Sequence, residues 1–210
     1  MLVLTLNQRD TPDAGDRVDA FLRSLDAVPG LDAAAALPFQ RSVGDELIGA
    51  VEDPALAVDV ALRALRERRW NVGVGVGGVM HADGTPGLPE SGDVHDAGGP
   101  ALSAARRAVE AAALSTARIP LAVRGRDETA AAEAEAVLKL VGQLVWTRTE
   151  AEWAVLDLLV PGVRGQQRPA AEALGITVQA VSQATQRAFW NEEHACRPAA
   201  ARLLGLVDAA

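Results

Sequence analysis

The sequence predicts an α+β protein of two domains, with helices on one face of a mostly antiparallel sheet over residues 1–145 and an all-α domain over residues 146–210. Short apolar runs alternate with segments of helical periodicity in the order β-α-β-β-α-β-α-β over residues 1–125. From residue 128 onward only helical patterns occur, and the helix that begins there could lead into the second domain.

Apolar periodicity and turn residues place the elements of the first domain. Asp53 is suited to cap a helix that begins at Pro54, and Gly44 is suited to the turn of a tight hairpin. Strands are predicted at 2–6, 36–42, 46–51, 70–80 and 119–123. Helices are predicted at 13–28, 54–68, 100–116 and 128–145, and a long loop at 81–98.

The composition favours a folded protein inside the cell. Apolar residues make up 49% of the 210 residues, enough for a real core. The net charge of −8 argues against a general polyanion binder, but not against a DNA-binding protein whose positive charge is confined to one small face. Cys196 is the single cysteine, which fits a reducing compartment. Without a signal peptide or a long apolar run, a cytoplasmic protein with no membrane partner is expected.

The strand at 70–80 alternates valines with glycines, among them Gly73 and Gly75, so one of its faces is almost bare of side chains. Such a face usually means that something packs closely on it. Either a helix lies against the sheet there, or a ligand rests on it. The run is not a dinucleotide fingerprint, because no helix follows the glycines directly.

The loop at 81–98 brings His81 and His95 near several aspartates. A metal site is one interpretation of this cluster, but a solvated acidic loop is the favoured one. No metal site and no cofactor are predicted.

The second domain has the spacing of a helix-turn-helix. Thr149 and Glu152 form a capping box at the start of its first helix, and a later helix ends at Gly175 before another at 178–192. Ala171 lies four residues before Gly175 and Val181 six residues after it. The other apolar positions in register are Ala170, Leu174, Ile176 and Ala184. This pattern predicts a helix-turn-helix that binds DNA, and the alternative is a helical hairpin that merely packs.

The outer face of the helix at 178–192 carries hydrogen-bonding side chains suited to base edges and phosphates. The candidates on this face are Thr177, Gln179, Ser182, Gln183, Gln186 and Arg187. Arg164, Gln167 and Arg168 lie just ahead and could reach the DNA backbone. Phe189 and Trp190 are expected in the core. Because the face has few positive charges, we expect binding to double-stranded DNA as a homodimer on two half-sites.

The N-terminal half resembles the SatD family, whose domain is similar to the catalytic domain of class III nucleotide cyclases and GGDEF proteins. The similar segments are Gly44–Gly49, Trp70–Gly77 and Gly98–Ala101, followed by Ala105–Ala108. The segment LGITVQAVSQ also looks like the helix-turn-helix fused to many members. The resemblance covers most of the chain and implies a ferredoxin-like, nucleotide-cyclase-like βααββαβ-type sandwich.

The resemblance also implies where a cyclase site would lie. Asp45 matches one metal-binding aspartate, whereas Leu4 stands where the other would be. Arg106 fits the arginine of an Asn-x-x-x-Arg pair, whereas Leu102 replaces its asparagine. Two-metal chemistry needs carboxylates on both sides of the reacting group, so no catalytic residue is predicted and the protein is not expected to be an enzyme.

Such a domain could still bind a nucleotide or second-messenger ligand, or only dimerise. The candidate ligand-binding residues are Asp45, Glu46, Gly73, Gly75 and Arg106. Ordinary turn chemistry is an equal explanation for Asp45 and Glu46.

Three functions follow. The first is a transcriptional regulator with a sensory or dimerising cyclase-like domain at 1–145 and a DNA-binding domain at 146–210. The second is a nucleotide-binding or nucleotide-processing enzyme with an accessory helical domain, which Leu4 and Leu102 disfavour. The third is a protein-binding adaptor, which the polar outer helix face disfavours.

Overall fold

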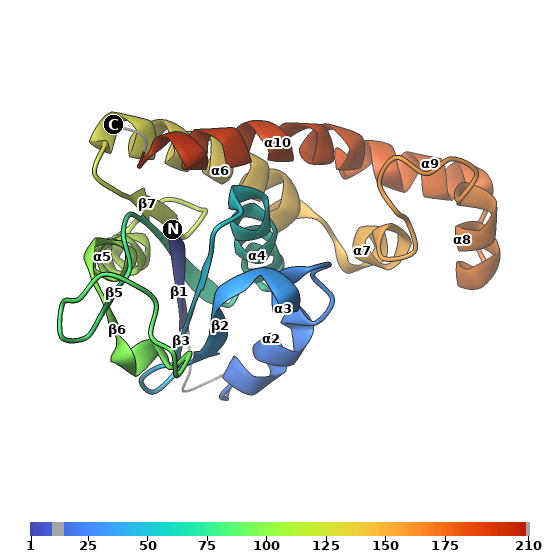
Figure 1. Ribbon diagram of the computed structural model, residues 1–210. Coiled ribbons are helices and arrows are strands. Elements are labelled where there is room, and N and C mark those ends of the chain that lie inside the picture. The colour runs from blue at the N-terminus through green and yellow to red at the C-terminus, as the bar shows by residue number, and fades with distance from the viewer. Residues whose placement is uncertain (10–14, 209–210) are drawn as a thin grey trace.

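The computed structural model describes residues 1–9 and 15–208 and has an α+β fold built on one mixed five-stranded sheet (Figure 1). The strands are β1 (Leu2–Gln8), β2 (Ala35–Arg41), β3 (Glu46–Val51), β4 (Trp70–Val76) and β7 (Leu121–Arg124). Their order across the sheet is β2-β3-β1-β4-β7. All neighbours are antiparallel except β4 and β7, which are parallel. The five predicted strands are confirmed.

Helices cover both faces of this sheet. On one face α2 (Val18–Leu25), α4 (Pro54–Glu67) and α6 (Glu128–Thr147) pack over side chains such as Leu4 and Val74. On the other face α5 (Pro100–Leu114) packs over Val3 and Ile48. The prediction that helices lie on one face only is therefore wrong. The chain must cross over from β4 to the parallel strand β7, and α5 makes this crossing on the face that the other helices leave open.

The glycine face of β4 is the contact surface for α5. A side-chain carbon at Gly73 would overlap backbone atoms of Val109, and one at Gly75 would overlap backbone atoms of Ala105. The helix interpretation of the alternating strand is thus confirmed. Because the backbone of α5 fills the space beside both glycines, neither Gly73 nor Gly75 has room to contact a ligand on this face.

Two of the capping and turn predictions for the first domain are confirmed. The side chain of Asp53 accepts a hydrogen bond of 2.8 Å from the backbone N–H of Ala55 and caps α4. Gly44 has φ +61° in the hairpin turn between β2 and β3. The helix predicted at 13–28 is shorter: α2 begins at Val18, a short α3 (Leu31–Ala34) follows, and residues 13 and 14 lie outside the described part of the chain.

The loop predicted at 81–98 has some structure of its own. It contains the short antiparallel strands β5 (Met80–His81) and β6 (Ala97–Gly98) and a 3-10 turn, η1 (Val94–Asp96). Val94 is buried against the α5 side of the sheet and anchors the loop.

The C-terminal helices divide into a small unit and a returning helix. The helices α7 (Glu150–Leu156), α8 (Gln167–Leu174) and α9 (Val178–Arg187) pack together, and α10 (Trp190–Leu206) then runs back along α6 (Figure 1). Ala200, Leu204 and Val207 are buried in the core beneath the sheet. The last helix of the predicted second domain, 146–210, therefore packs against α4 and α6 of the predicted first domain.

The helix predicted at 178–192 is interrupted. It ends at Arg187, and Phe189 has φ +49°, a left-handed conformation that is uncommon for a bulky residue. Phe189 is 53% exposed, so its predicted place in the core is also wrong. Among the described helices none is long and apolar enough to cross a membrane.

Candidate nucleic-acid interface

Helices α8 and α9 are joined by a tight turn at Gly175. Gly175 has φ +65°, and the backbone N–H of Ile176 donates to the carbonyl of Ala171 at 3.0 Å, which closes the end of α8. Ala171 and Val181 are both buried where the two helices meet. The small residue at Ala171 lets the two backbones approach, as the spacing in the sequence required.

The core of the α7–α9 unit is small. It consists of Val155, Ala170, Ala171, Val181 and Ala184. Leu174 and Ile176 were expected to join it, but they are 36% and 40% exposed. This expectation is wrong, because both residues flank Gly175 at the turn between α8 and α9 and neither joins the buried core of the unit. The capping box at the start of α7 is confirmed: Glu152 accepts from the Thr149 backbone, and Thr149 accepts from the Glu152 backbone.

One face of α9 points to solvent with hydrogen-bonding side chains. Gln179, Gln183 and Gln186 are exposed, and their amides have no hydrogen-bond partner among the described residues. Ser182 is half-buried. Thr177 is exposed, but its hydroxyl accepts a bond of 3.1 Å from the N–H of Ala180 and so caps α9. On this face of α9, the three glutamines are therefore more available to contact another molecule than Ser182 or Thr177.

The cations around this face are few. Arg164 and Gln167 are exposed ahead of and at the start of α8. Arg168 pairs with Glu172 at 3.1 Å, and Arg187 lies 3.6 Å from Glu152. Carboxylates outnumber cations between residues 149 and 189, where the three arginines Arg164, Arg168 and Arg187 stand against Glu150, Glu152, Asp157 and Glu172. Weak attraction to phosphates in general is expected of such a surface.

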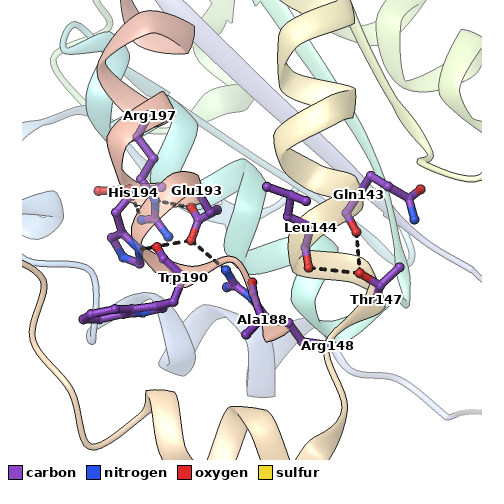
Figure 2. Close-up of polar contacts among 10 residues, drawn as sticks. Gln143, Leu144, Thr147, Arg148, Ala188, Trp190, Glu193, His194 and Arg197 are labelled. Atoms are coloured by element: carbon purple, nitrogen blue, oxygen red, sulfur yellow. Dashed lines mark hydrogen bonds and ion pairs between the residues drawn. The ribbon is translucent and has the colours of Figure 1, made fainter. Parts of the chain in front are cut away.

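A buried ionic network joins the α7–α9 unit to the rest of the protein, which we call the sheet domain and which comprises the five-stranded sheet, α2 to α6 and α10 (Figure 2). Arg148, directly before α7, is 2% exposed and donates from Nε to the carbonyl of Ala188 at 3.1 Å and from Nη2 to Glu193 at 3.2 Å. Arg197 donates to Glu193 and to Asp59 of α4, at 2.5 and 2.7 Å. Arg148 thereby ties the start of α7 to the α9–α10 junction.

Burial governs the charges in this network. It lowers the pKa of the Arg148 guanidinium, and the adjacent Glu193 carboxylate opposes the shift. Burial also lowers the pKa of the His194 imidazole, and the charge of Glu193 opposes this shift as well. Sequence reasoning missed the network, because nothing local to Arg148 indicates that it meets Glu193.

The structure also brings together some of the predicted ligand-binding residues. Glu46 and Arg106 line a cleft of about 280 Å³ with Asn7 and Glu110, between the sheet and α5. The amide of Asn7 donates to Asp45 at 3.2 Å. Burial raises the pKa of the Glu46 carboxyl, while Ser42 and the charge of Arg106 oppose the rise. Gly73 and Gly75 do not line this cleft, because α5 covers them.

Leu4 lies on the opposite face of the sheet from this cleft. Side chains alternate along a strand, so β1 contributes Val3, Thr5 and Asn7 to the cleft side and Leu4 to the large core. No carboxylate of β1 therefore faces Glu46. Leu102, near the start of α5, is buried against the sheet in the cluster that contains Val3 and Ile48.

Among the described residues no group of three or more His, Cys, Asp or Glu side chains is arranged to hold a metal ion. Comparison with models of protein families, with curated proteins and with solved structures finds no match to this chain.

Proposed function

We propose that the protein is a DNA-binding transcriptional regulator whose α8–α9 pair is a helix-turn-helix with α9 as the recognition helix. The observation that carries the proposal is the exposed row of Gln179, Gln183 and Gln186, which lies beyond a turn closed at Gly175 and has no partner among the described residues. Glutamine amides both donate and accept, which suits adenine edges in the major groove. Arg164 and Arg168 lie where they could contact phosphates.

The sheet domain would then be sensory or dimerising. The antiparallel order β2-β3-β1-β4, with α2 and α4 on one face, supports a ferredoxin-like βααββαβ sandwich to which α5 and β7 would be additions. This order supports the resemblance to nucleotide cyclases and the SatD family. The lack of a β1 carboxylate facing Glu46 favours a domain that does not turn over nucleotides. A homodimer on two half-sites would offset the weak charge of the α9 face.

Selection of bound fragments from genomic DNA by the full chain, followed by titration of a recovered fragment, tests the proposal. Saturable binding to a fragment containing two related half-sites, one or a few helical turns apart, is expected. Failure to enrich any sequence over random fragments would overturn the proposal.

Two substitutions test the role of α9. Gln183→Ala should weaken binding to the selected site by about 1–3 kcal/mol without changing stability, and Arg187→Ala should weaken binding to all sequences. Gln143→Ala on α6 and Arg107→Ala on α5 are matched controls that should bind as wild type. Equal binding by Gln183→Ala and Gln143→Ala would show that α9 does not read the site.

A further inference from the structure

A cleft of about 790 Å³ lies where α4, the end of α7 and the start of α10 meet. We call it the arginine cleft and define it by Arg63, Arg66, Arg148, Trp153, Asp157 and Trp190. Its volume is that of a small-molecule site. Its lining residue Trp190 directly follows Phe189, whose backbone is in the left-handed conformation at the α9–α10 junction. The cleft therefore lies where the α7–α9 unit meets the sheet domain.

Two guanidinium groups at this cleft have donors that nothing nearby uses. Arg63 donates from Nε to the Ser24 hydroxyl at 3.1 Å, and no carboxylate among the described residues pairs with it. Nη1 of Arg148 is buried and has no hydrogen-bond partner in the described part of the chain, although the guanidinium lies over the Trp153 ring, 4.9 Å from its centroid. A buried cationic donor without a partner is unfavourable, and an anion placed beside it would remove that penalty.

A neighbouring arginine adds to the positive charge. Arg66 follows Arg63 by one turn of α4, and its guanidinium stacks on Trp153 with 4.0 Å to the ring centroid. Burial and then the charge of Arg66 lower the pKa of Arg63, and the carboxylates of Glu67 and Asp157 oppose the shift without forming an ion pair with it. The unpaired Arg63 thus lies beside another cation on a partly dry surface.

The carboxylates of the cleft are already engaged. Asp157 accepts two bonds from Arg66, at 2.7 and 2.6 Å, on the half-exposed rim. Glu67 accepts from the indole N–H of Trp70 at 2.9 Å. The Asp157 carboxylate therefore occupies Arg66 in this structure. Because an exposed ion pair of this kind is weak, another anion can replace Asp157 on Arg66.

We propose that the arginine cleft binds a small organic anion through a phosphate or carboxylate group, held by Arg63 and Arg148, and that the ligand competes with Asp157 for Arg66. Because Arg66 belongs to α4 and Asp157 follows α7, the exchange would change how the α7–α9 unit is held. The binding site does not depend on the proposed DNA binding. Only the effect of the ligand on DNA affinity rests on it.

Calorimetry and tryptophan fluorescence with the full chain test the site, since Trp153 and Trp190 line it. The probes are phenyl phosphate, benzoate and the uncharged benzyl alcohol. Saturable binding of at least one anion and none of benzyl alcohol is expected, and the two anions distinguish phosphate from carboxylate. Absence of saturation by both anions in the millimolar range would overturn the proposal.

Charge-matched variants locate the bound anion. Arg63→Gln should lower the affinity about tenfold to a hundredfold, whereas Arg107→Gln on α5 should leave it unchanged. Asp157→Asn should raise the affinity about twofold to fivefold, because Arg66 is freed, whereas Glu128→Gln on α6 should not. Equal effects of Arg63→Gln and Arg107→Gln would place the anion elsewhere and overturn the proposal.

Discussion

The core beneath the sheet contains Trp70, Phe21 and many leucines, whereas the core of the α7–α9 unit contains two valines and three alanines. Burial of apolar area is the main force that stabilises a fold, and alanine contributes little of it. Chains below about 40 residues rarely fold on a core alone, and residues 149–187 are in this range. The sheet domain therefore has a large apolar core of its own, whereas the α7–α9 unit depends for its stability on its junction with that domain.

The buried Arg148–Glu193 pair should matter most. Arg148→Met leaves Glu193 with Arg197 as its remaining guanidinium partner, and we expect a loss of about 3–4 kcal/mol in the free energy of unfolding. Urea denaturation measures it. Arg168→Met breaks an exposed pair and should cost at most about 0.5 kcal/mol. Similar values for the two variants would show that the junction does not hold the unit.

The sheet domain should be most sensitive where α5 approaches β4. Gly73→Ala places a methyl group against the backbone of Val109, and overpacking of this kind should cost about 2–3 kcal/mol. Gly78→Ala is the control, since no atom lies within 4 Å of a side chain there. Thermal unfolding of both variants checks the difference, and a stable Gly73→Ala protein would contradict the close contact.

The small core should unfold by itself when it is weakened. Val181→Ala removes two buried methyl groups and should cost about 2 kcal/mol within the α7–α9 unit. Amide hydrogen exchange should accelerate in α7, α8 and α9 and stay unchanged in the sheet. Val178→Ala, at a position 47% exposed, is the control. Uniform acceleration over the whole chain would instead mean that the two regions unfold as one.

The smallest expected effect is the pH dependence of the capping box. The hydrogen bond from the Thr149 backbone lowers the pKa of Glu152 below its ordinary 4.5. The unfolded chain therefore binds this proton first, so the stabilisation is present above about pH 4.5 and is lost as the pH falls through the lower folded-state pKa. Protection of the α7 amides, measured relative to the exchange rate of the unstructured chain at the same pH, should fall over that acidic range in the native protein and less so in Glu152→Gln, and equal profiles would exclude this role.

Much of the local structure could be predicted. The Asp53 cap and the capping box at Thr149 follow from neighbours in the chain, and so does the turn at Gly175. The two interpretations of the glycine strand could not be separated from sequence, because the helix that fills the face begins more than twenty residues later along the chain. Of the candidate sites, the exposed glutamines of α9 follow from helical periodicity. Leu174 and Ile176 were wrongly expected in the core, because periodicity does not show whether another segment covers a turn.

Local patterns in the sequence were enough to locate the five strands of the main sheet and to identify a helix near the C-terminus with a polar outer face. Contacts between distant segments were needed to show that α5 lies on the opposite face of the sheet from α4 and that α10 returns to the first domain. They were also needed to show that Arg148 meets Glu193 and that Arg63 lies beside Arg66 without a carboxylate partner among the described residues. Periodicity and capping are properties of neighbouring residues, whereas the faces that meet and the charges that pair depend on contacts between distant segments.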